Sequence, residues 1–436
     1  MNQPNTSSRP SGPEYLRLVL LGAAIGIPAA VLAAVLLAVI HDLSQVLWHD
    51  LPKDLGSSSP QWYLVIGLPV VGAAVVVVAR RLLPGDGGKN PLIGLSHEPT
   101  PVPAVFGVVL AAIGTLAFGA VLGPEGPVIA VGSAVGMAVT LFVKLEPQAA
   151  GVLSTAGSFS SISALFDGPV VAGMMMVESG LAMGTALPMV LVPGLVAAAV
   201  GYLIFVGFGS WGGLNAPGLS VPDLPAYTGV HAGDLLIALI VGAGTTLVIA
   251  VVHGVGERVD RLQGARLSMP ILLLGGGLVV GALAELADLL GANSQNVLFS
   301  GQSSIPAIVA TSSTKIIVVT FVAKALAYAV SMGCGFRGGP IFPAIFLAVT
   351  VASFPVAWFH TSPTLAIAVG AAAGMCAQTR LLVTSVLFAG LLVGRAGADA
   401  IPAAVLAAVA AWLTHAVLEM RAAKPQPPQP QGRVNN

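Results

Sequence analysis

Apolar stretches interrupted by glycine and proline make up most of this chain, and two of the interruptions are unusually dense. They are Gly-Pro-Glu-Gly-Pro at 123–127 and Gly-Phe-Arg-Gly-Gly-Pro-Ile-Phe-Pro at 335–343. Glycine and proline break helices, so each segment should end one intramembrane element and begin another. A helix N-terminus exposes unpaired N–H groups and about half a positive charge, which favours an anion. The sequence therefore predicts two broken helices whose N-termini bind an anion.

The small number of charges indicates the class of protein. Charged residues make up 8% of the sequence and hydrophobic residues 56%, whereas soluble domains carry roughly 25% charged residues. A soluble fold of this length could not cover its surface with so few charges, so we expect an integral membrane protein in a lipid bilayer. Lys plus Arg and Asp plus Glu both number 18, and no long basic run is present. This pattern argues against nucleic acid as a partner.

The lengths of the apolar stretches predict an all-α membrane protein with tilted, broken and re-entrant helices. Several stretches are shorter than the roughly 20 residues that a perpendicular span needs, and many contain Gly or Pro. The stretches run approximately over 15–41, 61–83, 103–120, 127–143, 149–165, 168–206, 233–254, 268–291, 314–333, 340–358, 363–376, 381–394 and 400–418.

A fixed offset relates two landmarks in the first part of the chain to two in the second. Gly126-Pro127 and Gly339-Pro340 are 213 positions apart (339 − 126), and so are Gly157 and Gly370 (370 − 157). Equal offsets favour a duplicated half, although glycine is common enough here for chance alignment to be the alternative. Two halves whose broken helices meet at a shared midplane site are a recurrent plan among transporters.

The domain organisation follows from these patterns. We expect one transmembrane domain at 14–420, with repeat one at about 14–206 and repeat two at about 233–420. The polar segments at 1–13 and 421–436 are rich in Pro, Ser or Gln, and we expect disordered cytoplasmic tails there.

The charges of the loops predict the orientation. The loops 207–232 and 293–303 contain no Lys or Arg. By the positive-inside rule, the basic loops and both termini of a multi-pass protein in the cell membrane should face the cytoplasm. The basic residues are Arg80, Arg81, Lys89, Arg258, Arg261, Arg266, Arg421, Lys424 and Arg433.

Three motifs resemble signatures of the CLC family of chloride channels and chloride/proton exchangers. The segment 123–127 resembles the family's Gly-(Lys/Arg)-Glu-Gly-Pro, and 339–343 resembles its Gly-x-Phe-x-Pro. The segment 166–178 is similar to its Phe-x-(Ala)-Pro…Glu. Order and spacing agree across nearly the whole chain, and the variants resemble an atypical bacterial subgroup of ion-transport proteins. The resemblance implies a CLC-like fold of two inverted repeats and a homodimer with one anion pathway per subunit.

By this resemblance Glu125 is the gating glutamate, whose carboxylate occupies an anion site and leaves it when protonated or displaced. A carboxylate is itself an anion, so N–H groups that bind chloride also bind it. A charge in an apolar membrane region is costly and therefore functional by default. The alternative is a glutamate that caps the start of a helix.

Both glycine-rich segments supply candidate anion-binding groups. The N–H groups of Gly126, Ile341 and Phe342 are candidates to coordinate the anion, next to Gly339, because backbone dipoles stabilise it without trapping it. Unlike the family, this chain has Pro340 after Gly339, and proline has no N–H to donate. One family donor is therefore missing or shifted by a residue. Arg337 either compensates with its charge or lies at the interface or a helix end.

A further family element, Gly-Ser-Gly-Ile-Pro, matches the segment 87–91. Gly88 takes the place of the serine, so no hydroxyl is available to the anion. Asn90 offers an amide donor there and Lys89 a charge. The alternative for this segment is a basic loop with an Asn-Pro turn.

Proton coupling is where the sequence departs furthest from the family. Family exchangers carry an inner glutamate immediately after the position of Glu178, where this chain has Ser179, and a hydroxyl cannot carry a proton at ordinary pH. The family's pore tyrosine lies near the C-terminus, but no tyrosine follows Tyr328. We expect Glu178 to make a structural hydrogen bond rather than to conduct protons.

We therefore predict a glutamate-gated pathway for chloride or a similar small anion, channel-like or weakly coupled. The alternatives are a proton-coupled antiporter of chloride or fluoride and, from another class, a membrane scaffold without transport. No constellation of catalytic residues is visible, so we expect no enzyme, cofactor or metal site. His97 and His253 lack a ligand partner at useful spacing and are expected to be solvated.

Overall fold

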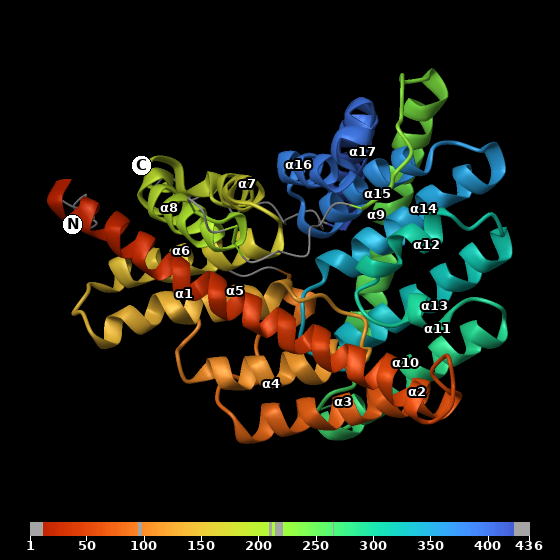
Figure 1. Cartoon of the computed structure of the whole chain (residues 1–436), viewed down its shortest axis with the longest axis horizontal. Helices are drawn as coiled ribbons and strands as arrows, with labels where there is room; N and C mark the ends of the chain where they lie inside the picture. The colour runs from red at the N-terminus through yellow and green to blue at the C-terminus, as the bar shows by residue number, and fades with distance from the viewer. Residues whose placement is uncertain (1–11, 95–97, 209–211, 214–220, 265, 423–436) are drawn as a thin grey trace, which may run out of the picture.

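The computed structural model describes residues 12–94, 98–208, 212–213, 221–264 and 266–422, and this part of the chain is almost entirely helical (Figure 1). The helices are α1 (Gly12–Gln45), α2 (Leu51–Asp54), α3 (Trp62–Leu82), α4 (Ala104–Leu116), α5 (Glu125–Ala138), α6 (Pro147–Leu165), α7 (Pro169–Ser179), α8 (Leu187–Val206), α9 (Ala232–Asp260), α10 (Met269–Leu289), α11 (Ser294–Val297), α12 (Ile305–Val309), α13 (Thr314–Gly333), α14 (Ile341–Phe359), α15 (Pro363–Thr379), α16 (Leu382–Val393) and α17 (Ile401–Ala422).

The predicted tails lie almost wholly outside the described residues. His97 also lies outside them. Helix α1 includes 12–13 and α17 includes 421–422, so each helix extends into a segment predicted as disordered.

Both predicted helix breaks are confirmed. Helix α5 begins at Glu125 and α14 begins at Ile341. The two segments that precede them pair with each other, because the Gly123 N–H donates to the Gly339 oxygen at 2.7 Å and the Gly339 N–H donates to the Gly123 oxygen at 2.6 Å. This antiparallel bridge sets the N-termini of two helices, far apart in the sequence, next to each other.

Several helices are shorter than a full span, as the apolar stretches predicted. In the described part of the chain, eight helical runs have the length and hydropathy to cross a membrane, and α4, α7 and α15 are shorter apolar helices. The apolar stretch at 168–206 forms two helices, α7 and α8. The chain turns between them at Gly184, whose φ of 53° favours glycine.

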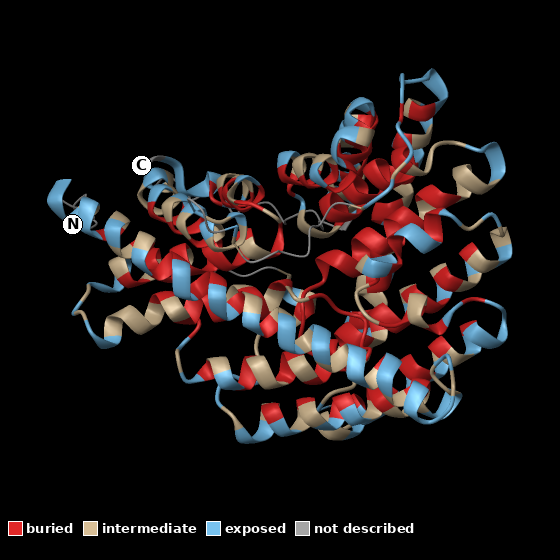
Figure 2. Ribbon diagram, viewed as in Figure 1, coloured by how far each residue is buried: buried red, intermediate tan, exposed pale blue. Residues whose placement is uncertain are grey.

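Glycines set the closest helix contacts inside the buried interior (Figure 2). A Cβ on Gly157 of α6 would collide with the Gly132 carbonyl of α5. In the second half, a Cβ on Gly370 of α15 would lie 2.6 Å from the Val349 Cα of α14. Small residues let membrane helices approach closely. The two glycines at the 213-residue offset therefore make equivalent contacts, each holding a helix against the one that begins at a break.

A leucine at position 157 should destabilise the protein. Overpacking a tight contact typically costs about 1–3 kcal/mol, and the contact here is with backbone that cannot rotate away. We expect Gly157→Leu to lower the melting temperature of the detergent-purified protein. Gly151→Leu, on the same helix but with open space around it, should change it little. Equal melting temperatures for the two variants would contradict the proposed role of Gly157.

Candidate anion site

Glu125 lies at the centre of the site, and its side chain is completely buried. Its Oε1 accepts hydrogen bonds from the N–H of Ile341 at 2.7 Å and the N–H of Phe342 at 2.9 Å. Glu125 is the first residue of α5, yet its carboxylate binds the N-terminus of α14. The carboxylate therefore caps the start of a helix, as the predicted alternative has it, although that helix is α14 and not its own.

The second carboxylate oxygen of Glu125 is less well satisfied. Oε2 is buried and makes no hydrogen bond within the described residues. It lies against backbone, because a Cβ on either Gly123 or Gly339 would collide with it. Glycine at these two positions therefore makes room for the carboxylate. A buried acceptor without a donor costs free energy, so the carboxylate is held on one side only.

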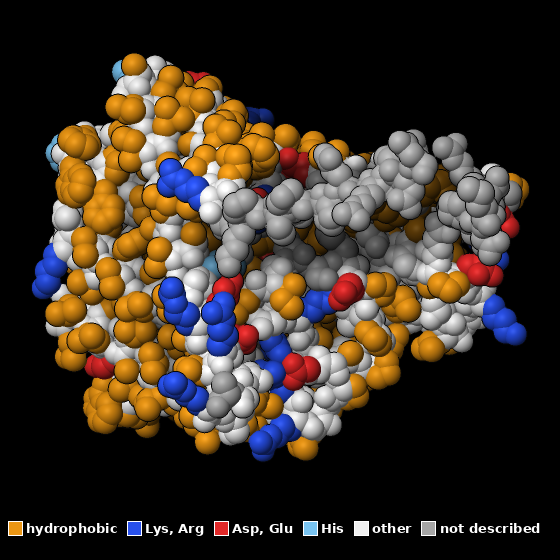
Figure 3. Space-filling view, turned by 180° about the vertical axis from the view of Figure 1, so that it is seen from behind, with side chains coloured by type: hydrophobic (Ala, Val, Ile, Leu, Met, Phe, Trp, Pro, Cys, Tyr) orange, Lys and Arg blue, Asp and Glu red, His pale blue; other side chains and the backbone are white. Residues whose placement is uncertain are grey.

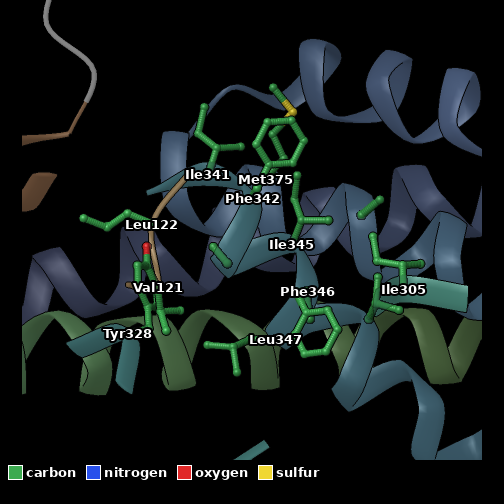
Figure 4. Close-up of a cluster of buried hydrophobic side chains, with 14 of the residues drawn as sticks. Val121, Leu122, Ile305, Tyr328, Ile341, Phe342, Ile345, Phe346, Leu347 and Met375 are labelled. Carbon is green, nitrogen blue, oxygen red and sulfur yellow. The ribbon is translucent and has the colours of Figure 1, made fainter. Parts of the chain in front are cut away.

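An aromatic cluster closes the site beyond Phe342. Its ring stacks on Phe166 with ring centroids 5.8 Å apart and lies 6.2 Å from Phe388. Figure 4 shows Phe342, Ile345 and Phe346 following one another along α14, with Met375 beside Phe342. Apolar packing on this scale excludes water, so the hydrogen bonds to Glu125 act in a medium of low dielectric constant.

Sequence analysis missed Tyr328, which lies on α13 and contacts Pro340, the residue before the two N–H donors to Glu125. Its hydroxyl donates to the Pro340 carbonyl oxygen at 2.7 Å and lies 3.2 Å from Gln378 Oε1. Figure 4 shows the hydroxyl pointing toward Leu122, in the segment that leads into α5. In the sequence, Tyr328 is a polar side chain in an apolar stretch, twelve residues before Pro340. This pattern does not reveal which group its hydroxyl contacts.

Arg337 is buried and binds Asp86, a residue that sequence analysis did not single out. Its Nε donates to the Asp86 carbonyl oxygen at 3.1 Å, and its guanidinium also forms an ion pair with the Asp86 carboxylate. Arg80 Nε donates to the same carboxylate at 2.8 Å. Of the alternatives left open for Arg337, a position at the interface is excluded, because only 5% of the residue is exposed. The two arginines clamp the loop before Gly87 to the loop before Pro340.

The pKa of Asp86 reflects this clamp. Partial burial raises the pKa of the carboxyl group, but the hydrogen bonds and charges of Arg80 and Arg337 more than offset that effect, so the pKa lies below its usual range.

The segment 87–91 lies near Gly126 but does not reach the Glu125 carboxylate. Asn90 Oδ1 accepts from the Leu92 N–H at 3.0 Å, and its Nδ2 lies 3.4 Å from Asp260 Oδ1. Lys89 forms an ion pair with Glu98 at 3.2 Å. The Asn90 amide therefore caps a short helical turn, as the alternative of an Asn-Pro turn predicted.

Glu178 makes the structural hydrogen bonds that the sequence predicted. Its carboxylate accepts from the N–H groups of Leu382 at 3.0 Å, Val383 at 2.8 Å and Thr384 at 2.8 Å. The carboxylate thus caps the N-terminus of α16. Ser179 donates to the Met175 carbonyl oxygen at 2.7 Å, on its own helix.

Removing the charge of Glu178 should destabilise the α16 contact. The charged cap satisfies three N–H groups, and charge-assisted hydrogen bonds contribute about 1.5–3 kcal/mol each. We expect Glu178→Gln to lower the melting temperature by several degrees, whereas Glu146→Gln, an exposed glutamate that makes no side-chain cap, should not. An unchanged melting temperature in Glu178→Gln would contradict the capping role.

Two cavities lie next to Pro340, the residue that precedes the two N–H donors to Glu125. One, the glycine cavity, has a volume of about 270 Å³ and is lined by Gly88, Lys89, Asn90, Gly126, Arg337 and Pro340, among others. The other, the histidine cavity, has a volume of about 470 Å³ and is lined by His253, Gln378, Arg380, His415, Ser179 and Ile341, among others. Pro340 lines both cavities, so both lie beside the N-terminus of α14.

His253 has a hydrogen-bond partner that the sequence did not predict. It is partly buried in the histidine cavity, and its Nε2 lies 3.0 Å from Gln378 Oε1. The sequence did not predict this partner, because only the tertiary structure brings α9 and α15 together at this point.

Solved structures share the fold. A slow cyanobacterial Cl⁻/H⁺ antiporter aligns with a TM-score of 0.72 and 16% identity, covering 94% of this chain and 96% of that one. A CLC-type fluoride/proton antiporter aligns with a TM-score of 0.69 and 20% identity, covering 93% and 96%. At these identities the likeness concerns the fold alone.

Sequence comparison supplies the family. "Putative ion-transport protein YfeO" of Escherichia fergusonii is 31% identical over 361 residues, covering 78% of this chain and 79% of the relative. The protein of the same name from Escherichia coli O17:K52:H18 is 32% identical over 359 residues, with the same coverage. The family model described as "Voltage gated chloride channel" matches residues 71–415. The chain therefore belongs to this family, the CLC family, and is a multi-pass helical membrane protein of the CLC fold.

Proposed function

We propose that the protein moves chloride or a similar small inorganic anion across the membrane, along a pathway that the Glu125 carboxylate gates. The observation that supports this most directly is the pair of hydrogen bonds from Ile341 and Phe342 to Oε1. Backbone N–H groups at a helix N-terminus also suit a chloride ion, because they offer partial charge without a full cation that would trap it. The carboxylate thus takes the place of the transported anion.

The gate opens when the carboxylate leaves these donors. Protonation removes the charge that the N–H groups stabilise, and an arriving anion competes for the same groups. Because Oε2 makes no hydrogen bond within the described part of the chain, displacement breaks few interactions. The glycine and histidine cavities, which Pro340 lines in both cases, supply approach routes to these donors.

The distribution of charge supports a membrane orientation. Figure 3 shows many of the charged side chains on this face in its central and lower part, with hydrophobic side chains covering most of the left and the top. In our proposal the protein lies in the plasma membrane, and its basic loops and both termini face the cytoplasm. The protein would act as a homodimer, with one pathway per subunit.

We also propose that the domain at 14–420 consists of two related halves, 14–206 and 233–420. The equivalent helix contacts of Gly157 and Gly370 support this division, as does the pairing of the two break segments.

Transport is channel-like or weakly coupled in our proposal, because Ser179 stands where the family's exchangers carry their inner glutamate. The alternative is a proton-coupled antiporter of chloride or fluoride. The structural neighbours described as Cl⁻/H⁺ and fluoride/proton antiporters are consistent with that alternative, but at their identities the likeness concerns the fold alone.

Flux measurements in proteoliposomes test the proposal. Chloride, fluoride and nitrate are compared under the same conditions, with and without an imposed proton gradient. If transport is passive, each anion moves only down its own electrochemical gradient. Movement of an anion against its gradient, driven by protons, would contradict channel-like transport and support the antiporter. Absence of anion flux above that of protein-free vesicles would leave the membrane scaffold as the remaining function.

A further inference from the structure

Pro340 and Ile341, which share one peptide group, are among the residues that line the histidine cavity. The N–H of this peptide is one of the two donors to Glu125, at 2.7 Å. In a trans peptide the carbonyl oxygen lies on the opposite edge of the same rigid plane. A group that binds the oxygen therefore acts on the donor without touching the anion.

Three side chains form a hydrogen-bonded chain from that oxygen to the cavity. The Tyr328 hydroxyl donates to the Pro340 oxygen at 2.7 Å and lies 3.2 Å from Gln378 Oε1. The same Oε1 lies 3.0 Å from His253 Nε2. Because Gln378 presents an oxygen, His253 Nε2 is the donor. The chain thus crosses three helices, α13, α15 and α9.

A hydrogen bond to a carbonyl oxygen has two effects on the N–H of the same peptide. It fixes the orientation of the peptide plane, and it polarises the group so that the N–H becomes a stronger donor, most of all where the dielectric constant is low. Both effects matter here because Pro340 has no N–H to donate. Ile341 therefore provides the first donor of α14, and Tyr328 supports it.

We propose that Tyr328 is a positioning residue for the anion site, and that Gln378 and His253 make the site's affinity for an anion depend on the protonation of His253. A second ring proton strengthens donation from Nε2 to Gln378 Oε1. The oxygen then competes less for the Tyr328 hydroxyl, which donates fully to Pro340. The added positive charge in the cavity also favours an anion. The proposal rests on the proposed function, since it concerns the same donors.

The other charged groups around His253 are largely paired with one another. Arg380 forms an ion pair with Glu419 at 2.5 Å and donates to His415 Nε2 at 2.9 Å. Glu257, one turn along α9, forms an ion pair with Arg261 at 3.3 Å. Protonation of His253 therefore adds a charge that no neighbouring ion pair already balances. The groups facing it from other helices are Tyr328 on α13, Gln378 on α15, Arg380 after α15, His415 and Glu419 on α17, and Ser179 on α7.

Chloride binding to purified protein tests the proposal. Isothermal titration calorimetry is carried out in a Glu125→Ala background, where the carboxylate neither competes nor titrates. Loss of one neutral hydrogen bond corresponds to about a fivefold loss of affinity, and we expect this for Tyr328→Phe at pH 6. Tyr227→Phe, which removes a buried hydroxyl bonded to Asp234 instead, should leave the affinity unchanged.

The pH profile separates positioning from a merely structural role. In the Glu125→Ala background, chloride should bind more tightly at pH 5.5 than at pH 8. His253→Gln, which keeps an amide donor but no titrating ring, should remove this difference, whereas His415→Gln should preserve it. Equal affinities with and without Tyr328→Phe, or an unchanged pH profile in His253→Gln, would overturn the proposal.

A second measurement does not depend on transport. Hydrogen–deuterium exchange of the peptide covering 336–346, in the protein with Glu125 intact, should be faster in Tyr328→Phe and unchanged in Tyr227→Phe. Unchanged exchange in Tyr328→Phe would overturn the positioning role even if anions are transported. If instead the exchange result is as expected but Glu125→Ala binds chloride no more tightly than wild type, the gating function fails and the positioning of the peptide stands.

Discussion

Proteoliposomes containing Glu125→Gln are expected to lose the activation of anion flux at low pH that the Glu125 carboxylate causes, which leaves only the smaller pH effect proposed for His253. In the wild type, lowering the pH protonates the carboxylate, frees the Ile341 and Phe342 donors and raises the flux. Two charge-assisted hydrogen bonds, worth about 1.5–3 kcal/mol each, hold the carboxylate in place. Glu125→Gln should therefore exceed the wild-type chloride flux at pH 8 by at least about tenfold.

Glu146→Gln is the matched control for this experiment. Glu146 is exposed at the start of α6 and makes no side-chain cap, so its replacement should preserve both the rate and the pH dependence of the wild type. Identical fluxes for Glu125→Gln and wild type at every pH would show that the carboxylate does not gate.

Replacing Asp86 by asparagine should disconnect the two loops that flank the site. The substitution leaves the Arg337 guanidinium buried without an anion, and breaking a buried ion pair costs about 3–5 kcal/mol. The Asp86 side chain is 56% exposed, so we expect a smaller loss, roughly 2 kcal/mol, together with reduced anion flux. Thermal unfolding in detergent measures the first effect and proteoliposome flux the second.

A double-mutant cycle with Arg337→Gln isolates the interaction, and Arg81→Gln, on the exposed side of α3, serves as control. The pH dependence has a defined sign. Because the folded-state pKa of Asp86 is lowered, its contribution to stability is present above the unfolded pKa and is lost as the pH falls through the folded pKa. The destabilisation by Asp86→Asn should therefore be complete at neutral pH and vanish in strong acid. Additive effects of the two substitutions would contradict the clamp.

Part of the anion site could be predicted from the sequence, and its supporting side chains could not. Glu125 and the start of α14 are marked by local chemistry: a carboxylate in an apolar region, and glycine and proline that end helices. Tyr328, Gln378 and Asp86 carry no such mark, because their partners lie 12 to 251 positions away in the chain. Arg337 showed the same limit, since its charge was visible in the sequence but its partner was not.

The sequence by itself determined that this is a helical membrane protein and where its helices break, because apolar length and the conformational limits of glycine and proline are local properties. It also identified the lone carboxylate at a break and predicted a structural hydrogen bond for Glu178, whereas the helix that Glu178 caps was seen only in the structure. Only the tertiary structure decided that the carboxylate binds the other half's helix rather than its own. That choice depends on the bridge between Gly123 and Gly339, a contact between segments more than two hundred residues apart, which no local pattern specifies.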